Sequence, residues 1–502
     1  MTVVACIQSV APIGFDGSIV EVESDIKNGL PSLQVVGLTN RSIDEAKERV
    51  RSAISNSLLD FPAKKLIINL APAELPKDGT HYDLAIALSI LVSSGQLHQN
   101  DVANSVFAGE LALNGDLRPV KGIISIVETA KKNGAKSLFI PLNNVPQALL
   151  VKGVDIYGVK SLQQLFLHLR GEARIEVSDP SKRSNTRKST ITYERLDDIH
   201  GQEQAKRALT IAAAGHHNIL FTGPPGAGKT MLARTLVSLL PDLSEEEQIT
   251  VTKLHSLAGE SIDEIITSRP FRSPHHTSSR IALIGGGVKP KPGEISLAHL
   301  GVLFLDEIPE YSRATLESLR QPLEDRQISI SRTSGYAKYP ADFMLVATMN
   351  PCPCGYYGDN VKECTCTSTQ ILSYQKRLSG PLVDRIDMVI PVSRVPTETL
   401  LHNTLSYSHH NNAKKVIQIA KTKQSTRYMS SNKYNSSLTS SMIKTLQITS
   451  EAKDLLKKAS DTLNLSARGY FKVIKVARTI ADIDSSNEIS SKHIAESLQY
   501  RQ

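Results

Sequence analysis

The chain has 502 residues, of which 40% are hydrophobic and 22% are charged, as expected for a folded protein of about three domains. No apolar run approaches the roughly 18 residues of a membrane helix, and the first residues lack the pattern of a secretory signal. We therefore expect a cytoplasmic protein with no membrane partner. The net charge of +8 permits a polyanionic partner but does not by itself identify one.

The first 170 residues mix strand and helix patterns, which predicts an α/β domain over residues 1–170. The dipeptide Asn114-Gly115 lies between GELAL and DLRPV and predicts a two-residue hairpin. We expect strands over residues 18–26 and 64–72, and helices over residues 42–57 and 82–94.

Residues 171–192 are rich in Ser, Lys, Arg and Asp and offer almost nothing to bury. Such a composition is typical of a flexible linker. We expect the next domain to begin at residue 193.

Residues 223–230 read GPPGAGKT and stand between an apolar strand pattern and a helical one. In such a loop the glycines let backbone N–H groups surround phosphate oxygens, Lys229 reaches the terminal phosphates, and the Thr230 hydroxyl binds Mg²⁺. The predicted phosphate-binding residues are Gly223, Pro224, Pro225, Gly226, Ala227, Gly228, Lys229 and Thr230.

Residues 302–307 read VLFLDE, an apolar strand that ends on two carboxylates. Asp306 is placed to hold Mg²⁺ through water, and Glu307 is placed to polarise the attacking water. The alternative is a glycine-rich turn and an ordinary strand with an acidic end. The order of the two motifs favours an enzyme that hydrolyses ATP with Mg²⁺.

Two further segments of the ATPase region predict insertions. Residues 269–301 are rich in Pro and Gly, which favours loops or a projecting hairpin. After Glu307, a strand pattern, a turn at Ser334-Gly335 and a returning strand that ends at Asn350 predict a second hairpin. Arg332, Tyr336 and Lys338 lie near its tip, where charge and ring contacts suit DNA; the alternative is a solvated tip.

Four of the five cysteines fall within residues 351–367, in the order C-P-C-x9-C-T-C. Clustered cysteines in a chain without secretory features favour thiolate ligation of a metal over disulfides, and four sulfurs suit tetrahedral Zn²⁺. Reduced surface thiols are the alternative. The predicted ligands are Cys352, Cys354, Cys364 and Cys366.

We assign residues 193–397 to the ATPase core. Residues 398–502 are mostly helical in pattern, with a polar, Ser/Asn/Lys-rich interruption over residues 407–441.

Four long strings resemble the ComM/YifB family of magnesium-chelatase-like AAA+ proteins: RPFRSPHH, GEISLAHLGVLFLDEIPE, NPCPCGYYGD and SGPLVDRIDM. The resemblance covers essentially the whole chain. It implies a P-loop AAA+ α/β core with pre-sensor hairpin insertions and a C-terminal helical lid. It also implies a homo-hexameric ring ATPase that drives DNA branch migration, as a helicase acting with recombination proteins to integrate foreign DNA in natural transformation.

The resemblance further assigns roles by position. Asn350 matches the first sensor, which hydrogen-bonds the γ-phosphate or the attacking water. Arg385 matches the arginine finger that reaches the neighbour's site, and Arg468 matches the second sensor that ties the lid to the nucleotide. Arg377 is a weaker candidate for an interface role.

The first 170 residues resemble the C-terminal proteolytic domain of Lon, but they depart from it at the catalytic positions. His81 in PKDGTHYD stands where the nucleophilic serine belongs, and Ile124 in PVKGII stands where the catalytic lysine belongs. A Ser-Lys protease needs both groups. We therefore expect a Lon-like domain without proteolytic activity.

Two other motor classes remain open alternatives. The ATPase region also resembles the motor subunit of magnesium chelatase, although no substrate domain for such a partner is evident in the chain. A protein-remodelling ATPase is the other alternative.

Overall fold

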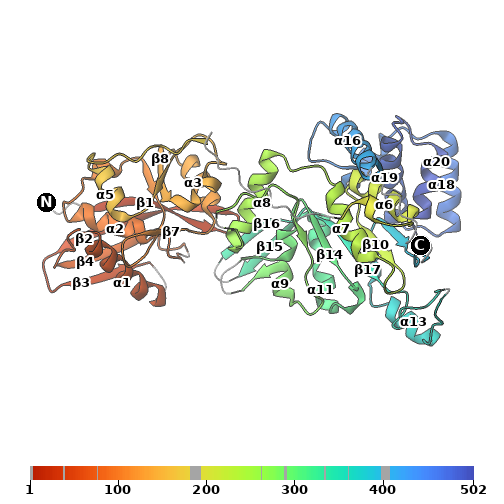
Figure 1. The fold of residues 1–502 in the computed structure, drawn as a ribbon, viewed down its shortest axis with the longest axis horizontal. Helices are drawn as coiled ribbons and strands as arrows, with labels where there is room; N and C mark the ends of the chain where they lie inside the picture. Colours follow the sequence, from red (N-terminus) through yellow and green to blue (C-terminus); the bar gives the residue numbers. More distant parts are fainter. Residues whose placement is uncertain are drawn as a thin grey trace.

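The computed structural model describes residues 4–37, 40–75, 77, 79–180, 194–261, 263–287, 291–332, 335–359, 361–396 and 408–501. The molecule is elongated, with one sheet-containing part in red to orange, a second one in yellow-green to cyan, and a helical part in blue beyond it (Figure 1). The expected α/β class is confirmed, because two mainly parallel sheets are each covered by helices. Residues 181–192 of the linker predicted over residues 171–192 lie outside the described residues.

The front part is built on a seven-stranded sheet of order β3-β4-β2-β1-β5-β8-β9. Strands β4, β2 and β1 pair antiparallel, whereas the pairs β3–β4, β1–β5, β5–β8 and β8–β9 are parallel. The expected strands and helices are confirmed with shifted ends. The elements are β1 (Ala5–Ile13), β2 (Asp16–Lys27), β3 (Ser32–Val36), α1 (Asn40–Asn56), β4 (Lys65–Ala71), α2 (Asp83–Ser93), β5 (Ser105–Phe107), β6 (Glu110–Leu111), β7 (Leu117–Arg118), α3 (Ile123–Lys132), β8 (Ser137–Pro141), α4 (Val145–Ala148), β9 (Asp155–Val159) and α5 (Leu162–Leu169).

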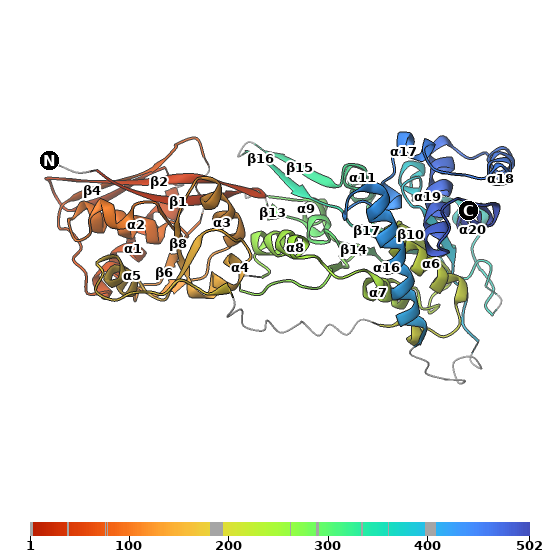
Figure 2. The ribbon, with the colours of Figure 1, turned by 90° about the horizontal axis from the view of Figure 1, so that it is seen from above.

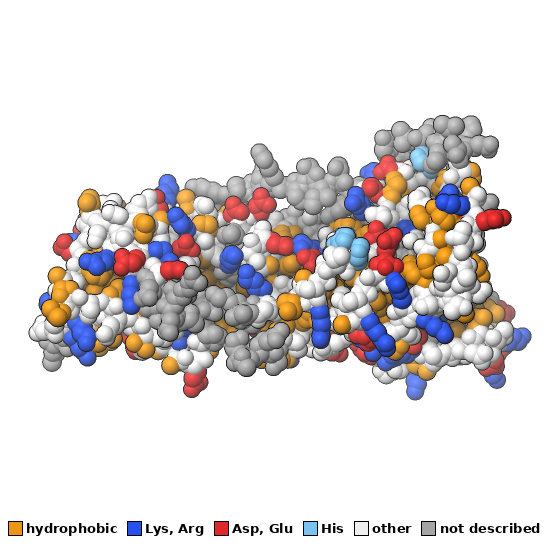
Figure 3. All heavy atoms as spheres, turned by 90° about the horizontal axis from the view of Figure 1, so that it is seen from below, with side chains coloured by type: hydrophobic (Ala, Val, Ile, Leu, Met, Phe, Trp, Pro, Cys, Tyr) orange, Lys and Arg blue, Asp and Glu red, His pale blue; other side chains and the backbone are white. Residues whose placement is uncertain are grey.

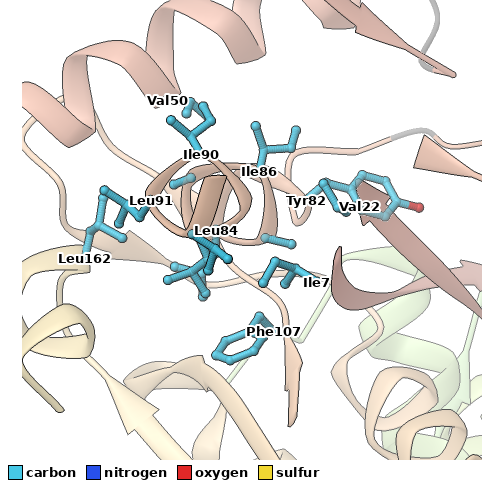
Figure 4. Close-up of a cluster of buried hydrophobic side chains, with 14 of the residues drawn as sticks. Ile7, Val22, Val50, Tyr82, Leu84, Ile86, Ile90, Leu91, Phe107 and Leu162 are labelled. Atoms are coloured by element: carbon cyan, nitrogen blue, oxygen red, sulfur yellow. The ribbon is translucent and has the colours of Figure 1, made fainter. Parts of the chain in front are cut away.

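Helix α2 forms the centre of this part. Every residue from Asp83 to Val92 is buried. A helix that is apolar on all sides must be covered on all sides, and α2 packs against β1, β2 and α1. Figure 4 shows Leu84 and Ile90 on different faces of α2, with Phe107 and Val50 among the side chains around them.

The predicted hairpin at Asn114-Gly115 is present, but its loop is longer than expected. Strands β6 and β7 pair Leu111 with Leu117, and the N–H of Ala112 donates to the carbonyl of Asp116. Gly115 adopts φ +88°, so the connection is a three-residue loop with glycine in the left-handed position. The dipeptide identified the turn but not its length.

The middle part is built on a five-stranded parallel sheet of order β11-β14-β17-β10-β18. We call the end where β10, β14 and β17 finish the carboxyl edge and the opposite end the amino edge. The elements are α6 (Glu203–Gly215), β10 (Ile219–Thr222), α7 (Lys229–Leu239), α8 (Glu245–Ala258), β11 (Phe271–Arg272), α9 (Arg280–Ile284), β12 (Gly285–Gly286), β13 (Lys291–Pro292), α10 (Glu294–Leu297), β14 (Val302–Leu305), α11 (Arg313–Ser318), α12 (Arg320–Asp325), β15 (Gln327–Arg332), β16 (Gly335–Pro340), β17 (Met344–Met349), α13 (Ser368–Gln375), α14 (Gly380–Val383) and β18 (Met388–Pro391).

The returning strand of the second hairpin does not run to Asn350, as the sequence pattern had indicated. Strand β16 ends at Pro340, and residues 341–343 separate it from β17. Among the described residues, strand β16 pairs only with β15, whereas the wholly buried β17 lies in the middle of the five-stranded sheet. One continuous apolar pattern therefore conceals two strands that belong to different sheets.

The last part is helical: α16 (Ser408–Tyr428), α17 (Ser440–Lys444), α18 (Ser450–Thr462), α19 (Ala467–Ile483) and α20 (Ser491–Gln499). The expected polar interruption over residues 407–441 is wrong for its first half, because α16 occupies it. Helix α16 buries Ile417 and Ala420 against neighbouring helices α6 and α19. The Gln424 amide donates to the Ala214 carbonyl at 2.9 Å. Packing thus stabilises a helix whose composition is mostly polar.

The front part contacts the middle part through α3 and α8. The Lys253 ammonium of α8 is 2.5 Å from the Glu128 carboxylate of α3 and 4.0 Å from the ring centre of Phe15. Only 3% of Lys253 is exposed. The β1–β2 turn also reaches the β15–β16 hairpin, where a Cβ on Gly14 would lie 2.9 Å from the Ala337 Cβ. Figure 2 shows β1, β2 and α3 next to β13 and α8.

Among the described residues, no helix is both long and apolar enough to cross a membrane. Figure 3 shows one face of the molecule, on which acidic and basic side chains are interspersed. The excess positive charge therefore forms no continuous basic surface over the described residues of that face.

Candidate functional site

The predicted phosphate-binding loop connects β10 to α7 at the carboxyl edge. Gly226 and Gly228 adopt φ +77° and +85°, and a Cβ on either would meet nothing within 4 Å. Glycine allows this left-handed backbone, and the loop faces open space. Gly228 is the N-cap of α7, so the helix directs its unpaired N–H groups toward the loop. The exposed Thr230 follows in the first turn.

Lys229 lies folded over this loop. Its ammonium donates to the carbonyls of Gly223 at 2.5 Å and Pro224 at 3.0 Å, and to the Asn350 Oδ1 at 3.0 Å. Burial lowers the pKa of Lys229 to about 8, although Asp306 and Glu307 oppose this shift. A phosphate bound in the loop would stabilise the charged form of Lys229. This is the contact between Lys229 and phosphate that the sequence predicts.

The acidic pair follows β14 and is held by Thr348 of β17. The Thr348 hydroxyl donates to the Asp306 carboxylate, and the Glu307 N–H donates to the Thr348 oxygen at 2.9 Å. This contact follows from the register, because Leu305 of β14 pairs with Ala347 of β17. Glu307 adopts φ +47°, a conformation that costs energy for a residue with a side chain and that sets the direction of its carboxylate.

Thr348 belongs to no sequence motif and was not predicted as a site residue. It is fully buried within the strand MLVATM, whose other side chains are apolar. A buried hydroxyl in such a strand needs a hydrogen-bond partner inside the protein. A single threonine among apolar strand residues was therefore the sequence feature that could have pointed to Thr348.

Asn350 connects the two halves of the site. Its Oδ1 accepts from Lys229 at 3.0 Å, and its Nδ2 donates to the Glu307 Oε1 at 3.4 Å. The structure therefore brings Lys229, Glu307 and Asn350 together at the carboxyl edge. The open cradle of glycine N–H groups fits phosphates, and the exposed Thr230 and Asp306 fit Mg²⁺ with its waters.

A cavity of about 450 Å³ continues from the loop and suits the nucleoside. His200, Met231 and Arg394 line it together with residues 225–228. Neither His200 nor Arg394 belongs to a sequence motif, so neither could be predicted from the sequence. Arg394 reaches the cavity because the end of β18 lies beside the loop.

Arg385 and Arg468 lie at the amino edge, on the opposite side of the sheet from the loop. Arg385 precedes β18, and its carbonyl accepts from the amide of Asn218, which precedes β10. The carboxylate of Glu324 pairs with Arg385 and, at 3.4 Å, with Arg468. Four strand residues at about 3.3 Å each separate this edge from the loop.

Within one chain, Arg468 lies away from the phosphate-binding loop, so its match to the second sensor stays a prediction. Helix α19 packs against α6, and its Lys472 donates to the Ile386 carbonyl at 2.7 Å. The first turn of α19 therefore carries Arg468 to the amino edge, beside Arg385. Arg377 lies elsewhere, with its guanidinium 3.0 Å from the Glu310 carboxylate.

In the β15–β16 hairpin, Tyr336 and Lys338 are exposed, while the alternating Ala337 and Tyr339 are buried. The Lys338 ammonium lies 5.6 Å from the centre of the Tyr336 ring. The side chain of Arg332 lies outside the described residues. The hairpin thus presents a charge and a ring together on one outward face.

The four cysteines converge. Their ligand atoms all lie within 4.8 Å of one another, and the cluster is the one group of potential metal ligands found among the described residues. The Cys352 sulfur is 3.3 Å from that of Cys354 and 3.6 Å from that of Cys364. These sulfur–sulfur distances are longer than a disulfide bond. They approach the roughly 3.8 Å that separates two sulfurs bound to one tetrahedral Zn²⁺ through bonds of about 2.3 Å. The Tyr357 N–H donates to the Cys352 sulfur at 3.3 Å, a contact that would stabilise a thiolate ligand.

In the front part, His81 and Ile124 are both buried. Burial lowers the pKa of His81 to about 4, so the imidazole is neutral near pH 7. Neither position offers the hydroxyl and amine of a Ser-Lys protease.

Comparisons with known proteins identify the family. Models of the magnesium chelatase subunit ChlI match residues 195–400 and 22–144, and a model of the C-terminal part of that subunit matches residues 408–501. The uncharacterized protein YifB of Escherichia coli is 44% identical over 98% of this chain and 96% of the relative. Competence protein ComM of Haemophilus influenzae is 41% identical over 99% of this chain and 97% of the relative. The chain therefore belongs to the ComM/YifB family of magnesium-chelatase-like AAA+ proteins.

Proposed function

We propose that this protein is a cytoplasmic, ATP-hydrolysing motor that moves DNA, and that it drives branch migration during the integration of foreign DNA in natural transformation. The observation that carries the ATPase assignment is the convergence of Lys229 and Glu307 on Asn350. The name of the Haemophilus influenzae relative, competence protein ComM, supports the biological setting.

Each residue at the carboxyl edge has its own role in the proposed hydrolysis of ATP. Lys229 binds the terminal phosphates, while Thr230 and Asp306 hold Mg²⁺, which neutralises the charge that develops on the phosphates. Glu307 orients and polarises the attacking water, and its direction is set by the Thr348 hydroxyl beneath it. Asn350 holds the γ-phosphate or that water in line.

We assign Arg385 and Arg468 to the nucleotide of a neighbouring subunit. Both lie at the edge remote from their own phosphate loop, and Glu324 holds both. A head-to-tail contact between copies would set this amino edge against the next carboxyl edge, and such contacts close into rings. A homo-hexameric ring is the arrangement that we propose.

The DNA contact that we propose is the outward face of the β15–β16 hairpin. Lys338 supplies charge for the phosphate backbone, and Tyr336 supplies a ring for stacking. Neither contact reads base identity, so the motor acts on DNA of any sequence. Zn²⁺ in the cysteine cluster completes the cofactor set.

The test is a strand-displacement and branch-migration assay with purified protein, ATP and Mg²⁺, together with ATPase rates. We expect forked or four-way DNA to stimulate hydrolysis and to be processed. Stimulation by an unfolded protein but not by DNA would contradict the proposal and favour a remodelling ATPase. The match to the magnesium chelatase subunit keeps a chelatase-like motor as the second candidate, which would respond to neither.

A further inference from the structure

The segment that carries the four cysteines contacts the phosphate-binding loop directly. We call residues 351–367 the cysteine segment; it follows Asn350 and precedes α13, which projects from the sheet below α7 and β17 (Figure 1). A Cβ on Gly355 would lie 2.7 Å from the Pro225 Cδ and 2.8 Å from its Cγ. The backbone of the segment therefore rests on the ring of Pro225, in the middle of GPPGAGKT.

A second contact joins the segment to the nucleoside cavity. The Asp359 carboxylate is 3.4 Å from the Arg394 guanidinium, which also lies 5.5 Å from the centre of the Tyr356 ring. Arg394 lines the cavity next to Pro225. The cysteine segment thus contacts both the phosphate end and the nucleoside end of the proposed nucleotide site.

The cysteine segment has little regular structure and little buried surface of its own. Its described residues form turns and bends without a helix or strand, and only Cys352 and Gly355 are buried. Cys352 and Cys354 precede the three contact residues, and Cys364 and Cys366 follow them. A metal bound to all four sulfurs would close the loop that carries Gly355, Tyr356 and Asp359. Small segments without a core derive their order from such a metal.

We propose that Zn²⁺ in the cysteine cluster holds this segment against the phosphate-binding loop, so that zinc occupancy sets the affinity for nucleotide. Preorganising a loop raises affinity because less conformational entropy is lost on binding. The inference rests on the proposed nucleotide site. It assigns the cluster a part in nucleotide binding in addition to structural support.

The first experiment measures binding of a fluorescent ADP analogue to the full-length protein before and after a zinc-selective chelator, with Mg²⁺ in excess. Zinc content is followed by elemental analysis and helix content by circular dichroism. We expect one zinc per chain at the start, about a tenfold higher Kd after its removal, and recovery when zinc is restored. Purified protein without zinc, or an unchanged Kd in zinc-free folded protein, overturns the proposal.

The second experiment uses two glycines of the same segment and stands even if zinc removal unfolds the chain. Gly355 and Gly358 have similar backbone angles, φ +86° and +77°, but a Cβ on Gly358 would meet nothing within 4 Å. Both substitutions to alanine carry a similar cost for the left-handed backbone, so a difference between them reports the contact with Pro225. In zinc-loaded protein we expect Gly355→Ala to raise the Kd for the ADP analogue about tenfold and Gly358→Ala to leave it unchanged. Equal Kd values for the two variants overturn the proposal.

The two proposals fail separately. If the zinc-loaded parent protein does not bind the ADP analogue, the proposed nucleotide site is wrong. If it binds and Lys229→Ala abolishes the binding, the nucleotide site stands, and the zinc and glycine comparisons alone decide the role of the cysteine segment.

Discussion

The two edges of the five-stranded sheet differ in how their charged side chains are held. At the carboxyl edge, Lys229, Asn350 and Glu307 form a chain of hydrogen bonds within one subunit. At the amino edge, Arg385 and Arg468 share one acidic partner, Glu324, and face away from their own phosphate loop. We propose from this difference that one chain supplies the groups that bind the nucleotide, and that a neighbouring chain supplies the arginines that stabilise the charge of the transition state.

Lys229→Ala has the largest expected effect on the carboxyl edge. Loss of the ammonium removes its phosphate contact, and we expect nucleotide affinity to fall at least about 100-fold. Equilibrium binding of a fluorescent ATP analogue measures this. The midpoint of thermal unfolding checks that the variant is folded. Near-normal binding would show that the loop holds nucleotide without Lys229.

Glu307→Gln separates hydrolysis from binding at the same edge. The amide cannot polarise water, so we expect kcat to fall about 10²–10⁴-fold while nucleotide affinity is retained. Steady-state phosphate release measures the rate. The matched control is Glu310→Gln, an exposed carboxylate in the next turn, which should retain most activity. A Glu307→Gln protein with the parent rate would exclude Glu307 as the activating group.

Arg385→Ala tests whether the two edges serve one site in different subunits. Alone it should lower kcat by about 10²-fold, because transition-state charge loses its arginine. Mixed equally with Lys229→Ala protein, it should recover about a quarter of the parent ATPase, since a quarter of head-to-tail contacts pair two intact halves. Mixed assemblies that form but recover no activity would contradict a shared site.

Thr348→Val tests the support beneath the acidic pair. The methyl group keeps the packing of β17, but Asp306 and the Glu307 N–H lose their partner. We expect about a tenfold lower kcat and about 1 kcal/mol lower stability, measured by ATPase rates and chemical denaturation. Thr348→Ser keeps the hydroxyl and should restore most of the rate; equal rates for the two variants would remove Thr348 from the mechanism.

Lys338→Ala has the smallest expected effect and lies away from both edges. Loss of one phosphate contact should reduce the slope of the logarithm of DNA affinity against the logarithm of salt concentration by about one. The ATPase rate without DNA should be unchanged. Lys457→Ala, an exposed lysine on α18, is the control and should leave the slope unchanged. A Lys338→Ala protein with the parent slope would place the DNA contact on another surface.

Features that depend on a few consecutive residues could be predicted from the sequence, whereas features that depend on contacts between distant segments could not. The loop around Lys229 and the strand before Asp306 could be predicted because the glycines, the lysine and the apolar run lie within a few consecutive residues. Thr348 could not, because its importance depends on the pairing of β14 with β17. Strands β16 and β17 merge into one apolar pattern, since nothing local marks the change of sheet at residues 341–343.

The C-terminal helices show the same limit. The polar composition of α16 concealed a helix that is stabilised by α6 and α19. The position of Arg468 depends on where α19 docks, through Lys472 and the Ile386 carbonyl, and no local pattern encodes that docking. The contact between Gly355 and Pro225 joins segments about 130 residues apart, so it too required the tertiary structure.

Lys253 has a practical consequence for dissecting the molecule into parts. A truncated chain that begins at residue 194 would keep this lysine on α8 but lose both Glu128 and Phe15, its ion-pair and ring partners. The newly uncovered face of α8 would present an unpaired cation among side chains that had been covered, and Gly14 would no longer cover Ala337 of the hairpin. Activity lost on truncation would therefore report damage to α8 and the hairpin as well as absence of the front part. The substitution Glu128→Gln, made in the intact chain, removes the ion pair while leaving the covering surface in place.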